Sequence, residues 1–183
     1  LKNRTIGLDG VPEQLANYRS MGFVPNYETF RWSGKLQGRI DPDICSLEDI
    51  NPASLITFDA ECFAERRAAF LQAWLALPRQ TKVLIRDGAI CGYAVARQCH
   101  EGCKIGPLFA VDSDAATTLI LACAAEVEGQ LIHIDVPADQ ARFSAVLEGH
   151  GFECGFQTTR MYRGTPPSFE TACVFGVTTL ELG

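Results

Sequence analysis

The sequence lacks the features of a membrane protein and of a nucleic-acid-binding protein. Its longest apolar runs, such as residues 119–125, are far shorter than the roughly 20 residues that span a bilayer. No basic segment followed by an apolar stretch opens the chain, as it would in a secretory leader. The 16 basic residues are scattered among 22 acidic ones, and the net charge is −6. We therefore expect a cytoplasmic protein with no membrane and no nucleic-acid partner.

Metal-ligand patterns are also scarce, although the chain contains eight cysteines. The best candidate for a metal pair is Cys99-His100-Glu101-Gly102-Cys103, and no second Cys/His pair follows at the spacing of a zinc site. Most cysteines stand among apolar residues, as Cys123 does, where a thiol acts as a small hydrophobic group. A chain of 183 residues can build a core without disulfides, so we expect reduced thiols and no bound metal.

What the sequence does contain is the composition of a folded domain, 47% apolar and 21% charged. Asp87-Gly88 between two apolar runs is a strong hairpin signal. Strands are predicted at 5–8, 23–32, 82–86, 90–98, 104–109, 131–136, 152–163 and 175–182, and helices at 12–20, 59–77, 115–126 and 138–148. This order predicts an α+β (mixed α/β) fold with a mostly antiparallel twisted sheet flanked by helices.

The two ends of the sequence contain a weak internal repeat. In each copy a Val-Pro pair leads through a predicted helix to a Gly-Phe pair, then to an aromatic residue, a threonine and an arginine at the same offsets. The first copy is Val11-Pro12, Gly22-Phe23, Tyr27, Thr29 and Arg31, and the second is Val136-Pro137, Gly151-Phe152, Phe156, Thr158 and Arg160. The first copy has too few elements to form a core of its own.

We therefore divide the chain into three parts. Residues 1–34 are interpreted as the strand-helix-strand end of a first domain, and residues 55–183 as a complete second domain. Residues 35–54 contain glycine and proline with little periodicity, which is typical of a linker. On this division the chain is part of a longer protein. The alternative is that residues 1–34 form an arm used in a strand exchange or a homodimer.

These residues resemble the GNAT superfamily of N-acetyltransferases. The hairpin from Val83 to Val95 resembles its two central antiparallel strands, and the run from Tyr18 to Phe23 resembles its carboxy-terminal Tyr-x-x-x-Gly-Phe element. Residues 55–183 are most similar to the second domain of a bacterial two-domain GNAT group, through the runs 104–110, 134–137, 160–164 and 174–177. The resemblance implies a tandem protein with a GNAT fold: an acetyltransferase domain followed by a GNAT-like carboxy-terminal domain.

The resemblance also implies acetyl-CoA as co-substrate, with its pyrophosphate held by backbone N–H groups at the start of a helix. The family motif at that place is Arg/Gln-x-x-Gly-x-Gly/Ala. The matching run 110–116 has no glycine and carries Asp112 and Asp114. Two carboxylates would repel a pyrophosphate, and they are typical of helix caps. We expect acetyl-CoA to be bound mainly by the first domain.

The general acid that the resemblance implies is the tyrosine four residues before Gly-Phe, which would protonate the departing CoA thiolate. In the first copy of the repeat this residue is Tyr18, and in the second it is Leu147, which has no proton to donate. Tyr18 is therefore the candidate catalytic residue, and the complete domain is expected to be catalytically degenerate. Alternatively, Tyr18 is an ordinary helix aromatic that packs against a sheet.

Together, these features predict an N-acetyltransferase that transfers acetyl from acetyl-CoA to a primary amine on a small molecule or a protein. This chain would be an incomplete part of that enzyme, inactive or poorly active by itself. The alternative is a noncatalytic module that keeps the GNAT fold as a scaffold for substrate binding or dimerisation.

Overall fold

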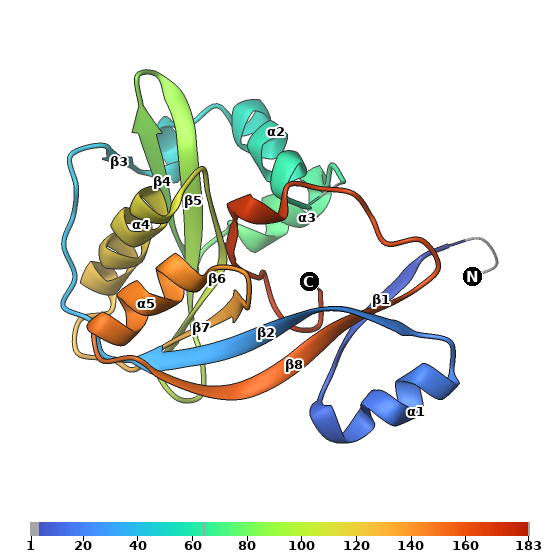
Figure 1. Cartoon of the computed structure of the whole chain (residues 1–183). Coiled ribbons are helices and arrows are strands. Elements are labelled where there is room, and N and C mark those ends of the chain that lie inside the picture. The colour runs from blue at the N-terminus through green and yellow to red at the C-terminus, as the bar shows by residue number, and fades with distance from the viewer. Residues whose placement is uncertain (1–3, 64, 183) are drawn as a thin grey trace.

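A computed structural model describes residues 4–63 and 65–182. Nine strands form one sheet in the order β1-β8-β2-β7-β6-β5-β4-β3, with β9 beside β6 (Figure 1). Neighbouring strands are antiparallel except for β6 and β7. The strands are β1 (Ile6–Gly10), β2 (Val24–Gly34), β3 (Ile44–Cys45), β4 (Gln80–Arg86), β5 (Ala89–Gln98), β6 (Cys103–Ala110), β7 (Ile132–Pro137), β8 (Glu153–Arg163) and β9 (Val174–Gly176). The predicted fold class is confirmed.

Helices cover both faces of the sheet (Figure 1). They are α1 (Leu15–Ser20), α2 (Pro52–Phe63), α3 (Ala68–Trp74), α4 (Ser113–Glu126) and α5 (Ala141–Gly149). Strand alternation divides the core: Leu84 of β4 belongs to the cluster under α4 and α5, whereas its neighbour Val83 belongs to the cluster under α2 and α3. In the described part of the chain no helix combines the length and apolarity needed to cross a bilayer.

The hairpin between β4 and β5 follows from its two turn residues. Asp87 and Gly88 both adopt positive φ angles, 51° and 76°, which a two-residue turn of the primed type requires. Asp tolerates this conformation and glycine adopts it at no steric cost. The predicted hairpin is therefore found at the predicted position.

The helix that we predicted to begin at Asp59 begins earlier and is interrupted. It begins at Pro52, where the Asn51 side chain accepts a hydrogen bond from the Ala53 N–H at 2.9 Å. The helix α2 ends at Phe63, and Arg67 adopts non-helical angles before α3 begins. The prediction was wrong because the residues before Asp59 show little periodicity, and because the interruption depends on a tertiary contact of Arg67.

Two further segments differ from their predicted form. The strand predicted at 175–182 is reduced to the short β9, because the Val177 N–H donates to the Asp135 carbonyl of β7 at 3.0 Å and the chain bends away. The segment 35–54, which we interpreted as a linker, contains β3 and the buried side chains of Leu36 and Ile50. It is therefore packed against the same sheet.

The internal repeat is visible in the sheet. The unit β1-α1-β2 repeats the unit β7-α5-β8, and each unit gives its last strand to the other: β2 lies between β7 and β8, and β8 lies between β1 and β2 (Figure 1). The central cross-strand pair is Thr29 with Thr158, which occupy the same position in the two copies. A local two-fold relation therefore organises this half of the sheet.

Candidate functional site

The strands β6 and β7 are the parallel pair of the sheet, and they are paired only at their first residues. Their register joins 103–105 to 132–134, and beyond these residues the two strands separate. The segment 174–179 occupies the opening: β9 pairs with β6, and Val177 bonds to β7. We call this opening the β6/β7 wedge. It is filled by the chain itself.

A buried polar cluster fixes the segment that fills the wedge. The hydroxyl of Thr178, which is fully buried, accepts a hydrogen bond from Arg67 Nη1 at 3.1 Å. Arg67 also makes a bidentate pair with Asp59, both N–O distances being 2.8 Å, and the Tyr93 hydroxyl donates to the same carboxylate. Burial without a partner is costly for each of these groups, so the cluster is stable only when complete. This requirement explains the helix interruption at Arg67.

A second buried carboxylate lies at the wedge on β7. Asp135 accepts hydrogen bonds from Arg31 of β2 at 2.8 and 3.2 Å and from Lys104 of β6. Burial alone would raise the pKa of Asp135, but the two cations outweigh burial and lower it. Burial lowers the pKa of Lys104, and Asp135 opposes that effect. Both charges are thus held inside the sheet by each other.

A similar ion pair, made by the repeat-equivalent arginine Arg160, lies on the other side of the local two-fold axis. Asp9 of β1 faces Arg160 of β8, and Arg160 Nη1 donates to Asp9 Oδ2 at 2.5 Å. The side chains are only 4% and 12% exposed. Burial raises the pKa of Asp9, with Arg160 acting in the opposite direction. The sheet therefore carries two matched Asp–Arg pairs, one beside β7 and one beside β1.

The start of α4, where the family holds the CoA pyrophosphate, is occupied by carboxylates, as we predicted. Asp112 caps the helix by accepting from the Ala115 N–H at 2.8 Å. Asp114 pairs with Arg142 at 2.8 Å. Both side chains at this helix start are acidic, and the β6/β7 wedge is filled by the segment 174–179.

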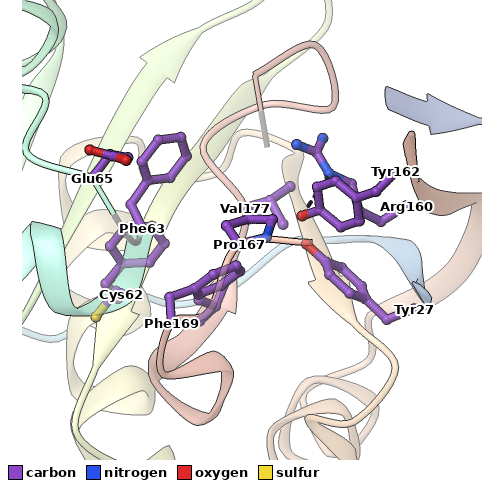
Figure 2. A pocket seen from close by; sticks show the side chains of 11 residues that line it. Tyr27, Cys62, Phe63, Glu65, Arg160, Tyr162, Pro167, Phe169 and Val177 are labelled. Atoms are coloured by element: carbon purple, nitrogen blue, oxygen red, sulfur yellow. Dashed lines mark hydrogen bonds between the residues drawn. The ribbon is translucent and has the colours of Figure 1, made fainter. Parts of the chain in front are cut away.

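A cavity of about 150 Å³ lies between strands β2 and β8 and the end of α2 (Figure 2). Tyr27 of β2 and Tyr162 of β8 point their hydroxyl groups into the same part of it (Figure 2). Its walls are mostly apolar and aromatic: Cys62, Phe63, Phe109, Pro167, Phe169, Val174 and Val177, with Arg160 and Glu65 as the charged members. In the sequence, Tyr27 and Arg160 stand out only as repeat positions, because nothing local indicates that strands so distant in sequence share a cavity.

The predicted acid, Tyr18, lies on α1, away from this cavity. It is half-buried, packs edge-on against Phe23 at 6.1 Å between ring centres, and lies beside Gly10 of β1. Its repeat equivalent, Leu147, belongs to α5 and is buried in the core between that helix and the sheet. Among the described residues no group of three or more His, Cys, Asp or Glu is arranged to hold a metal ion, at Cys99 and Cys103 or elsewhere.

Comparison with known proteins gives several matches. Residues 55–176 match the model of an acetyltransferase (GNAT) domain. The chain is 34% identical, over 184 residues, to a protein named holothin acyltransferase from Pseudoalteromonas sp. (strain SANK 73390), and the match covers 98% of the chain and 63% of that protein.

Solved structures agree on the fold. The crystal structure of an assigned acetyltransferase from Pyrococcus horikoshii superposes with a TM-score of 0.80 at 19% identity, covering 98% of this chain and 60% of that one. A GCN5-related N-acetyltransferase from Sphaerobacter thermophilus superposes with a TM-score of 0.60 at 13% identity, covering 91% of this chain and 62% of that one. The chain therefore spans less than two thirds of each of these relatives. The matched domain model, the curated relative and the shared fold place this chain in the GNAT acetyltransferase family.

Proposed function

We propose that this chain is part of an N-acetyltransferase that transfers acetyl from acetyl-CoA to a primary amine on a small molecule. The match of residues 55–176 to a GNAT domain supports acyl transfer from an acyl-CoA. The relative named for holothin supports a small-molecule acceptor. In the reaction the amine nitrogen attacks the thioester carbonyl carbon, the C–N bond forms and the C–S bond breaks.

The observation that carries the proposal is the repeat of β7-α5-β8 in β1-α1-β2. In the second copy, β7 is flanked by the parallel strand β6, with the wedge between them. The equivalent edge of β1 has no strand partner among the described residues. A first GNAT domain would supply a strand parallel to β1 and, with it, an open wedge for acetyl-CoA. The proposal thus assigns residues 1–34 to that domain and residues 55–183 to the second.

Tyr18 is the proposed general acid of this first site. It lies on α1 beside β1, at the repeat position that Leu147 takes in the complete domain. A phenol at this place donates its proton to the sulfur of the departing thiolate while the amine loses a proton to solvent.

The test is Tyr18→Phe in the full-length protein, with release of free CoA thiol measured over a set of small primary amines. We expect kcat to fall by about 100- to 10,000-fold, the usual contribution of a positioned acid, with little change in the KM for acetyl-CoA. Asn17→Ala alters a neighbouring side chain of the same helix and serves as the control. Unchanged turnover in a folded Tyr18→Phe variant would rule out the assigned role.

A second function is favoured by one specific observation, the filled β6/β7 wedge. The complete domain would then be a noncatalytic module that keeps the GNAT fold as a scaffold for substrate binding or dimerisation. If the full-length protein releases no CoA with any amine while it remains folded, this second function replaces the first.

A further inference from the structure

We propose that Cys62 of α2 and Cys173, in the turn Thr171–Cys173 before β9, are a redox-sensitive thiol pair that a small hydroperoxide converts to a disulfide. Both thiols are free in the structure. The bond would tie α2 covalently to the segment that fills the β6/β7 wedge. The inference goes beyond the proposed function and does not depend on it, because acyl transfer uses neither thiol.

Two hydrogen bonds bring these distant residues to one place. The Glu170 N–H donates to the carbonyl of Glu61, the residue before Cys62, at 3.2 Å. The Cys173 thiol donates to the Glu170 carbonyl at 2.9 Å, which holds its sulfur at the same junction. Both cysteines belong to the core cluster under α2 and α3, where Cys62 is 1% and Cys173 8% exposed, and their side chains interact directly. The fold therefore supplies the proximity that a disulfide requires.

One thiol of the pair ionises more readily than the other. The interaction with the Cys62 thiol lowers the pKa of Cys173. Burial and the carboxylates of Glu170 and Glu61 act in the opposite direction. The same thiol–thiol interaction, together with burial, raises the pKa of Cys62. Cys173 is therefore the thiol that becomes a thiolate, the form that attacks an oxidant, and Cys62 is the thiol that completes the disulfide.

A small uncharged oxidant has a route to the pair. Cys62 lines the cavity of about 150 Å³, and so does Val174, the residue after Cys173 (Figure 2). A cavity of this size holds several molecules as small as water. Its charged wall residues, Glu65 and Arg160, act on ions rather than on neutral molecules. Hydrogen peroxide is small and neutral, so it is the oxidant that this cavity admits.

The reaction takes two balanced steps. The Cys173 thiolate attacks one oxygen of hydrogen peroxide, and the O–O bond breaks. The sulfur becomes a sulfenic acid, while the other oxygen leaves as hydroxide and takes up the proton that Cys173 released, giving water. The Cys62 sulfur then attacks the Cys173 sulfur, the S–S bond forms, and the sulfenic oxygen leaves with the Cys62 proton as a second water. Two thiols are oxidised and one peroxide is reduced.

The test treats the 183-residue chain with hydrogen peroxide, alkylates the remaining thiols under denaturing conditions and maps the disulfides by mass spectrometry. We expect a Cys62–Cys173 cross-link. Because this bond closes a long loop, we expect Tm to rise by about 5–15 °C and to return to its first value with dithiothreitol. Hydrogen exchange of the Val177 amide should slow in the oxidised protein, since the cross-link restrains the segment in the wedge.

Cys62→Ser and Cys173→Ser should each abolish the cross-link and the rise in Tm. Cys154→Ser is the matched control, because it removes an exposed thiol outside the pair, and its cross-link should form as in the native chain. Peroxide treatment that leaves Cys62 open to alkylation, or that joins other cysteines instead, would overturn the proposal. This mapping is done on the native chain, so it requires neither the folding of a variant nor any acyl transfer.

Discussion

At the scale of single residues, the most demanding groups of this molecule are carboxylates placed inside the sheet. Asp59, Asp135 and Asp9 are nearly or fully buried, and each is paired with an arginine. The arginines of Asp135 and Asp9 come from distant parts of the chain, whereas Asp59 is paired with the nearby Arg67. Two of these arginines, Arg31 and Arg160, occupy equivalent positions in the repeat. The ion pairs explain why those positions are arginine, because a buried carboxylate without a partner costs several kcal/mol.

Asp135→Asn tests how much a buried ion pair stabilises the fold, at the carboxylate that two cations share. The substitution leaves the Lys104 ammonium buried without its counter-charge, so we expect the free energy of unfolding at pH 7 to fall by about 3–5 kcal/mol. The measurement is urea denaturation of both proteins. A loss below about 1 kcal/mol would contradict the role of the pair.

The pairing of Asp135 with its cations also makes the free energy of unfolding depend on pH. The folded-state pKa of Asp135 is lowered, so its contribution to stability is fully present above the ordinary pKa of about 4 and is lost as the pH falls through the lower folded value. The difference in stability between the native protein and Asp135→Asn should therefore narrow below about pH 4. A difference that stays constant down to pH 2 would show that the charge of Asp135 is not what stabilises the fold.

At the scale of elements, the decisive feature is the segment 174–179 in the β6/β7 wedge. The fit depends on Gly106 of β6, because a Cβ at this position would lie 2.6 Å from the carbonyl oxygens of both Val177 and Thr178. Neither carbonyl is the end of a flexible side chain, so no small adjustment relieves the contact. The wedge is therefore closed by backbone complementarity as well as by the Arg67 cluster.

Gly106→Ala should displace this segment. We expect a loss of about 1–3 kcal/mol in the free energy of unfolding and faster hydrogen exchange at the Val177 amide, which bonds to Asp135. Gly149→Ala is the control, because nothing lies within 4 Å of the added Cβ and the residue ends a helix, where alanine is favoured. If both variants exchange the Val177 amide at the native rate, the segment is not held by this contact.

At the scale of the whole molecule, two repeats share one sheet by exchanging their last strands. The exchange places an Asp–Arg pair on the first strand of each unit, β1 and β7, yet only β7 has a parallel neighbour among the described residues. The wedge at β7 is filled. An open wedge for acetyl-CoA would therefore lie on the far side of β1, in the proposed first domain.

This arrangement predicts the outcome of a calorimetric titration. Acetyl-CoA titrated into the 183-residue chain should give no saturable binding, whereas the full-length protein with the proposed first domain should bind it at one site. The intact mass of each protein is measured alongside, to confirm which chain is being titrated. Saturable binding by the 183-residue chain, accompanied by lost protection of the Val177 amide, would mean that the segment 174–179 leaves the wedge and that the complete domain binds the co-substrate itself.

The sequence by itself determined the features that depend on neighbouring residues. The Asp87-Gly88 turn and the Asp112 cap of α4 are local, and each was found where it was predicted. The carboxylates at the start of α4 were also evident from the sequence, and a helix start with carboxylates is unfavourable for anions.

Only the tertiary structure decided which distant segments meet. The insertion of β2 between β7 and β8 and the cavity between Tyr27 and Tyr162 join residues more than a hundred positions apart. The filling of the wedge joins the segment 174–179 to strands β6 and β7, which precede it by a whole helix and strand. Alternation along a strand predicts which side chains share a face, but it does not specify the neighbouring strand. That choice depends on burying both faces of the sheet and on pairing every buried charge, conditions that the whole chain satisfies together.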